Sequence, residues 1–259
     1  MSDRNEREVE LHRALAAEYS TRYGADFARE YQVHWNKKLI DLLPEGGRSV
    51  LDIGCGTGVF LGELVTRFPE VTGLDLSLDM LEAVPEAVAR RCHLLCGPIE
   101  SADLPPGIFD AVVCRGVLHH VADLETTLLK IFSLLRPGGV LVFSEPCNDS
   151  LLLRFPRWYW RSFSDRFDRD HFALGSGLLN RALGHAGFQV TARHKFGFVA
   201  FPLCSLSDIL PVMCYLPAAL SLARGLIKFD ELCAKIPGVR NESWHVIYRA
   251  ERPQPTASD

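Results

Sequence analysis

The stretch "VLDIGCGTG" at residues 50–58 is an apolar run that carries an acid, Asp52, and ends in three alternate glycines. These glycines are Gly54, Gly56 and Gly58. Glycines at a turn of this kind let the backbone come close to a nucleotide. The dinucleotide fingerprint GxGxxG needs a third glycine at position 59, where this chain has Val59. The spacing therefore predicts a nucleotide site and argues against a bound pyrophosphate.

The segments after this turn alternate between two patterns. Short buried strands are predicted at 49–54, 71–77, 93–97, 109–116, 140–145, 188–194 and 242–251. Helices are predicted between them at 59–68, 78–90 and 178–186, with a further helix that Asp123 caps and a turn at Pro137-Gly138-Gly139. Such alternation indicates a mostly parallel sheet with right-handed crossovers. Ligands of these sheets bind at the carboxyl ends of the strands, so residues 52–58, 75, 97–100, 114–120 and 145 should meet at one edge.

Asp75 closes the second predicted strand, where a carboxylate can accept hydrogen bonds from both hydroxyls of a ribose. Such an acid would serve NAD and S-adenosylmethionine equally well. The glycine spacing does distinguish the two ligands, because it argues against the pyrophosphate that NAD contains.

Four segments in order complete a family pattern: "VLDIGCGTG", "VTGLDLS", "FDAVVCRGVLHHV" and "LLRPGGVLVFSEP". Together they resemble the class I S-adenosylmethionine-dependent methyltransferases over about residues 45–146. The resemblance implies an α/β fold with a Rossmann-like seven-stranded methyltransferase sheet, in which strand seven is antiparallel. It also implies S-adenosyl-L-methionine as cofactor and methyl transfer from its sulfonium.

The same resemblance assigns the cofactor site. Asp52 and the three glycines would hold the methionine portion, Asp75 the ribose, and Leu76 with Met80 the adenine. The set is completed by Tyr23, Cys55, Ile99, Glu100 and Arg115. One departure concerns the adenine: where the family often has an acid after the third strand, this chain has Pro98. The backbone of Ile99, or Glu100 shifted by one residue, would then take over that contact.

Catalysis of methyl transfer rests largely on alignment, and a general base is needed only where the acceptor must lose a proton. The candidates are His119 and His120 after the fourth strand and Glu145 at the end of the fifth. His119 with Glu145 resembles the His–Glu dyad of C-methyltransferase domains in polyketide synthases. The alternative is that "LHHV" is a packing signature shared by methyltransferases with many substrates.

The chain is divided into an N-terminal helical lid at 1–44 and a methyltransferase domain at 45–259. Tyr19 and Tyr23 on the first helix belong either to that lid or to the core, and His34 and Trp35 are expected in the core. Two insertions, at 154–172 and about 196–240, are expected to cover the substrate.

The second insertion is long and apolar, and no charge occurs from Ile209 to Ala223. Pro211 and Pro217 limit it to short helices, and the stretch is too short and broken to span a membrane. Membrane contact, a substrate pocket, a dimer contact and ordinary core packing are the alternatives. We expect four side chains to face the acceptor pocket or a membrane surface: Leu210, Met213, Tyr215 and Leu216.

Composition narrows the function further. The 28 basic and 32 acidic residues give a net charge of −4, and no basic run indicates a nucleic-acid partner. The eight scattered cysteines, including the pair Cys92 and Cys96, suit reduced, buried thiols in a cytoplasmic protein. We expect a monomer or homodimer, without a metal, that methylates oxygen or carbon of a small, largely apolar acceptor such as a lipid, quinone or polyketide. The alternatives are a catalytically silent cofactor-binding partner protein and a methyltransferase of nucleic acids or proteins.

Overall fold

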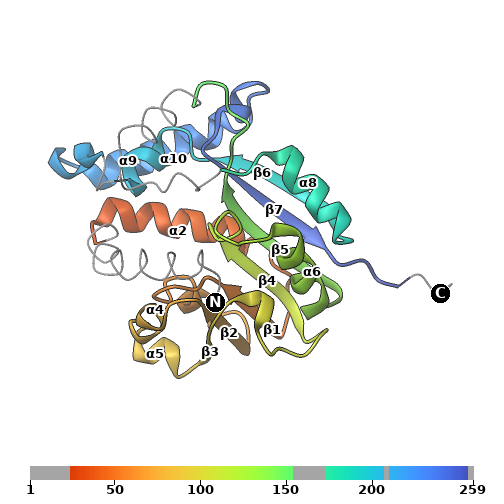
Figure 1. The fold of residues 1–259 in the computed structure, drawn as a ribbon. Helices are drawn as coiled ribbons and strands as arrows, with labels where there is room; N and C mark the ends of the chain where they lie inside the picture. Colours follow the sequence, from red (N-terminus) through yellow and green to blue (C-terminus); the bar gives the residue numbers. More distant parts are fainter. Residues whose placement is uncertain (1–23, 154–172, 207–209, 256–259) are drawn as a thin grey trace.

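The computed structural model describes residues 24–153, 173–206 and 210–255, which build a seven-stranded sheet in the order β3-β2-β1-β4-β5-β7-β6 (Figure 1). The strands are β1 (Ser49–Ile53), β2 (Glu70–Asp75), β3 (Cys92–Cys96), β4 (Phe109–Arg115), β5 (Leu135–Pro146), β6 (Gln189–Phe196) and β7 (His245–Glu251). The first five strands run parallel, whereas β7 is antiparallel to both β5 and β6. This topology confirms the predicted Rossmann-like sheet with an antiparallel seventh strand.

Helices cover both faces of the sheet, so that its central strands are buried on both sides. One face packs against α2 (Asp26–Ile40) and α3 (Leu61–Leu64) through a core that includes Val50, Val113 and Val142. The other face packs against α6 (Leu124–Leu134) and α8 (Ser176–His185) through a core that includes Leu51, Val112 and Leu141. As predicted, the Asp123 side chain caps α6, where it accepts hydrogen bonds from two backbone N–H groups.

Several predicted boundaries are wrong for local reasons. The helix expected at 78–90 is two short ones, α4 (Leu78–Glu82) and α5 (Glu86–Ala89), because Pro85 interrupts it and begins the second. The turn expected at Pro137-Gly138-Gly139 lies within β5, where the register with β4 shifts. The start of strand seven is later than expected because η3 (Val239–Glu242) forms a 3-10 turn.

The helix α2 is part of the core. Tyr31, Trp35 and Leu39 are all buried on it, which confirms the expectation for Trp35. His34, which was also expected in the core, is only partly buried. Its Nε2 lies 3.2 Å from a carboxylate oxygen of Glu231. Tyr19 and Tyr23 lie outside the described residues, so the lid at 1–44 stays a prediction.

The insertion between β6 and β7 adds a layer beyond α2 (Figure 1). It contains α9 (Ala200–Ser205), η2 (Pro211–Tyr215) and α10 (Ala219–Cys233). The prolines do keep η2 short, but α10 begins after Pro217 and runs for 15 residues, so the expectation of short pieces throughout is wrong. Within the described residues, no helix combines the length and the apolar character needed to cross a bilayer.

The four side chains of the insertion that were expected to face a pocket or a membrane differ in their burial. Met213 is buried in the same core as α2 and does not line the cavity at the carboxyl ends of the strands. Tyr215 and Leu216 are exposed, and Leu210 is half-buried. A membrane role for the exposed pair stays a prediction.

The cysteines are free thiols, and those of the central strands and of α9 are buried. Cys96 is exposed, which corrects the expectation of a buried pair at Cys92 and Cys96. The reason is the position of their strand, since β3 is one of the two edge strands of the sheet.

Candidate active site

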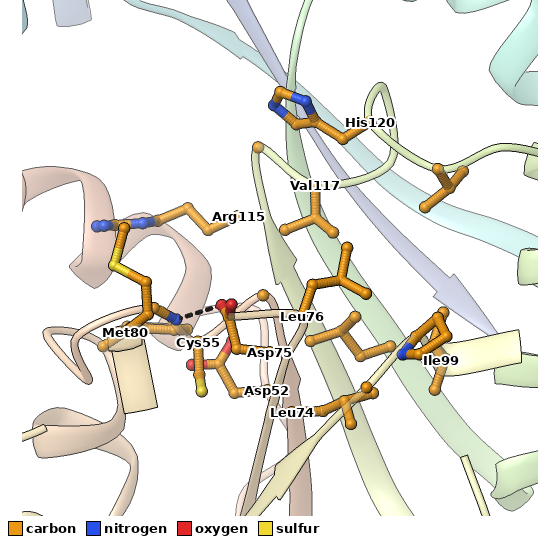
Figure 2. Close-up of a pocket in the computed structure, with 18 of the residues that line it drawn as sticks. Asp52, Cys55, Leu74, Asp75, Leu76, Met80, Ile99, Arg115, Val117 and His120 are labelled. Atoms are coloured by element: carbon orange, nitrogen blue, oxygen red, sulfur yellow. Dashed lines mark hydrogen bonds between the residues drawn. The ribbon is translucent and has the colours of Figure 1, made fainter. Parts of the chain in front are cut away.

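A cavity lies at the carboxyl ends of β1, β2 and β4, as predicted for a parallel sheet (Figure 2). The predicted cofactor residues that line it are Asp52, Gly54, Cys55, Gly56, Asp75, Leu76, Met80, Ile99, Glu100 and Arg115. Gly58 does not line it, and Tyr23 lies outside the described residues.

The three glycines of the first turn all have positive φ, at 70° for Gly54, 53° for Gly56 and 78° for Gly58. A Cβ atom at Gly54 would lie 2.3 Å from a methyl of Val117, and one at Gly58 would lie 2.9 Å from a methyl of Val84. A Cβ at Gly56 would meet nothing within 4 Å. Gly54 and Gly58 therefore allow the turn to pack against its neighbours, whereas Gly56 presents open backbone to the cavity.

Asp75 is held by the backbone of two turns. Its Oδ2 accepts a hydrogen bond of 2.8 Å from the Gly56 N–H (Figure 2). Its Oδ1 accepts one of 2.9 Å from the Ser77 N–H. A carboxylate has about four acceptor positions, so both oxygens can still accept hydrogen bonds from a ligand. The aspartate is thus oriented toward the cavity before any ligand binds.

Asp52 is the most unusual group in the cavity. Its side chain is 1% exposed, and among the described residues neither carboxylate oxygen has a hydrogen-bond partner. Burial raises the pKa of Asp52 to about 7, with Asp75 adding to the rise and the Arg115 guanidinium opposing it. A buried carboxylate without a partner is costly, and a cationic group of a ligand would remove that cost.

Side chains of α2 hold Arg115 in a hydrogen-bond network that was not predicted from the sequence. Its Nη1 donates hydrogen bonds to Gln32 Oε1 at 2.9 Å and to Asn36 Oδ1 at 2.6 Å. Its guanidinium carbon lies 5.3 Å from the ring centre of Trp35. Asn36 in turn donates a 2.6 Å hydrogen bond to Glu63. The one available signal was two polar residues, four apart, beside the apolar stripe of α2.

Other parts of the cavity wall are apolar. Leu76, Met80 and Ile99 line it, and Pro98 stands where the family often has an acid. The Glu100 carboxylate accepts a hydrogen bond from Thr127 of α6, so its position is fixed from outside the cavity. Further lining residues that the sequence did not single out include Val117, Val121 and Ala122.

The structure brings the two residues of the predicted dyad together. His119 Nδ1 lies 2.6 Å from Glu145 Oε2, and Glu145 is wholly buried. The other oxygen, Oε1, accepts backbone N–H groups from Val117 at 2.9 Å and Leu118 at 2.7 Å. The carboxylate thereby fixes both the loop after β4 and the imidazole. The His120 ring is tilted against the His119 ring, with 3.9 Å between ring centres. His120 lines the cavity, whereas His119 does not.

The residues present fit S-adenosylmethionine. The buried Asp52, which has no hydrogen-bond partner in the described part of the chain, suits the ammonium of its methionine portion. The anchored Arg115 suits the carboxylate. Asp75 suits the ribose hydroxyls, and the apolar part of the cavity suits the flat faces of adenine. The open backbone at Gly56 leaves room for a chain to pass between these groups.

Comparison with known proteins agrees with this fit. Residues 27–193 match the family described as "Methyltransferase domain". An uncharacterised methyltransferase of Mycobacterium tuberculosis is 36% identical over 153 residues, which are 59% of this chain and 72% of the relative. The malonyl-[acyl-carrier protein] O-methyltransferase of Serratia marcescens is 34% identical over 140 residues, 53% of this chain and 54% of the relative.

A crystal structure of an S-adenosylmethionine-dependent methyltransferase from Thermotoga maritima has the same fold. Its TM-score is 0.65 at 20% identity, and the match covers 94% of this chain and 99% of that one. The fold, the matching family and the relatives lead to one assignment. The chain belongs to the class I S-adenosylmethionine-dependent methyltransferases.

Proposed function

We propose that this methyltransferase acts on oxygen or carbon of a small, largely apolar acceptor, and that His119 removes the acceptor's proton while Glu145 positions His119. S-Adenosylmethionine supplies an electrophilic methyl group on a sulfonium. The observation that carries the proposal is the 2.6 Å contact between His119 Nδ1 and the buried Glu145.

The dyad gives the histidine the tautomer that a base requires. With Nδ1–H donated to Glu145, the lone pair of the neutral ring lies on Nε2, where it can accept a proton from the acceptor. The imidazolium formed in that step would be stabilised by the buried carboxylate, which cannot turn away because two backbone N–H groups hold its other oxygen. A base of this kind contributes about 10²- to 10⁴-fold to the rate.

The apolar character of the acceptor is supported by the loop after β4, whose Val117, Val121 and Ala122 line the cavity together with His120. The aromatic side chains around β5 belong to the core behind this wall. Trp35 donates a 3.0 Å hydrogen bond to Ser144, and His245 pairs with Pro146 in the sheet, so aromatic side chains flank the strand on which Glu145 lies. Phe201 of α9 packs edge-to-face against His245, with ring centres 4.4 Å apart. The Serratia relative, an O-methyltransferase, agrees with an oxygen acceptor.

The test uses methyl-labelled S-adenosylmethionine and cell extract, followed by partition between water and an organic solvent. We expect label in the organic phase with the wild-type protein. His119→Ala should lower the transfer at least about 100-fold while the affinity for S-adenosylhomocysteine stays near normal. His93→Ala, which removes an exposed histidine of β3, is the matched control.

Three results would contradict the proposal. Label confined to nucleic acid, protein or water-soluble products would exclude an apolar acceptor. Near-normal transfer by His119→Ala would show that the acceptor needs no base, and loss of cofactor binding in that variant would favour the packing interpretation of "LHHV".

A further inference from the structure

The outward side of α10 and of the segment after it carries exposed apolar side chains. We define the α10 stripe as Leu222, Phe229, Leu232, Ile236 and Val239. Phe229 is 52% and Leu232 is 59% exposed. On the helix, a spacing of seven and then three residues keeps these side chains on one face. An exposed apolar stripe of this length is a feature of interaction surfaces.

The stripe is held outward by the opposite side of the helix. Asp230 is buried and accepts backbone N–H groups from residues 198–200 at the start of α9, at 2.7 to 3.1 Å. Glu231 pairs with Lys38 of α2 at 2.7 Å. Because this side is bonded to α9 and α2, α10 cannot roll to bury its stripe without breaking those bonds.

Among the described residues, the exposed charges near the stripe that have no ion-pair partner are all positive. The exposed charged residues nearby are Lys228, Lys235 and Arg240. The acids in the described part of this stretch are engaged elsewhere: Asp230 and Glu231 with the partners above, and Glu242 with Ser150 and the Leu152 N–H. Arg224 pairs with Glu30 of α2 at 2.9 Å. The outward surface is therefore apolar and positive.

We propose that the α10 stripe and its basic neighbours dock on an anionic lipid membrane surface. An amphipathic helix that lies in a membrane interface combines buried apolar side chains with lysines and arginines that attract anionic lipid. A second copy of the chain is a poorer occupant, because stripe-to-stripe packing would bring two sets of three cations together. The proposal does not depend on the identity of the methyl acceptor.

Sedimentation with vesicles tests the proposal on the full chain without any methyl transfer. We expect binding to vesicles that contain phosphatidylglycerol, much weaker binding to pure phosphatidylcholine, and a loss of binding at high salt. Each lysine near an anionic surface is worth about fivefold in affinity, so Lys228→Glu with Lys235→Glu should weaken binding at least about 25-fold. Phe229→Ser with Leu232→Ser should abolish it.

Leu129→Ser is the matched control, because Leu129 is 54% exposed on α6, which packs on the opposite face of the sheet. This variant should bind vesicles like the wild type. All variants should retain affinity for S-adenosylhomocysteine, which shows that they are folded. The proposal is overturned if the chain ignores anionic vesicles or if stripe and control variants bind alike. It is also overturned if sedimentation equilibrium shows a dimer that Phe229→Ser with Leu232→Ser dissociates.

Discussion

Replacing Asp52 with asparagine should stabilise the ligand-free protein at alkaline pH and weaken its affinity for the cofactor. Burial raises the pKa of Asp52 from 3.8 to about 7, so the folded state holds this proton more tightly than the unfolded chain does. The contribution of the group is therefore most favourable below about pH 4 and is lost as the pH rises through about 7. At 1.36 kcal/mol per pKa unit, the loss is about 4 kcal/mol.

Asparagine cannot ionise, and the cost of burying its amide does not change with pH. The free energy of unfolding of Asp52→Asn relative to wild type should thus rise by about 4 kcal/mol between about pH 4 and pH 8. Urea unfolding at the two pH values measures this difference. Asp103→Asn, which alters an exposed acid, is the control and should leave the pH dependence unchanged. Parallel pH curves for Asp52→Asn and wild type would refute the reasoning.

The ligand should offset part of this difference in stability, because it binds the wild type more tightly than the variant. An ammonium placed against Asp52 forms a charge-assisted hydrogen bond, which the variant loses, so its affinity for S-adenosylhomocysteine should fall by about 1.5–3 kcal/mol. In the wild type the affinity should also fall as the pH drops below about 7, because the carboxylate takes up a proton. Calorimetry across this range measures both effects, and equal affinities would place the ammonium elsewhere.

Three further substitutions separate the parts of the site. Asp75→Ala should weaken S-adenosylhomocysteine binding by about 1.5–3 kcal/mol in calorimetry, and an unchanged value would mean that another residue binds the ribose. Asn36→Leu should weaken the binding of S-adenosylhomocysteine, because the anchored Arg115 binds its amino-acid portion. The binding of methylthioadenosine, which lacks this portion, should not change. Equal losses of affinity for the two ligands would indicate a general structural effect. Glu145→Gln should lower turnover about as much as loss of His119, because the glutamine amide would donate to Nδ1 and shift the ring proton to Nε2; a near-normal rate would exclude the dyad.

Much of the fold was predictable because strand signals and glycine turns are local. The apolar run at 49–54 and the acid at Asp75 mark the ends of adjacent parallel strands, so the edge at which ligands bind follows from topology alone. The Glu145 contact with His119 was predictable for the same reason, since β4 and β5 are neighbours.

Long-range partners were not predictable in this way. Gln32 and Asn36 are ordinary polar residues in the sequence, and only the packing of α2 on the sheet brings them to Arg115. Similarly, the buried position of Asp230 depends on the fold of the insertion, not on its neighbours in the chain. Where tertiary contacts determine which residue a side chain bonds to, the periodicity of the sequence cannot predict that partner.

Asp230 also has a consequence for chimeric enzymes. Its carboxylate joins α10 to the start of α9 through three backbone N–H groups, so neither helix carries a complete set of partners by itself. A chimera that takes only one of these helices from a relative would leave groups without their hydrogen-bond partners: either the buried Asp230 carboxylate or the three backbone N–H groups at the start of α9. Recombination between relatives should therefore move the whole insertion between β6 and β7 as one cassette, with the joints placed in these two strands.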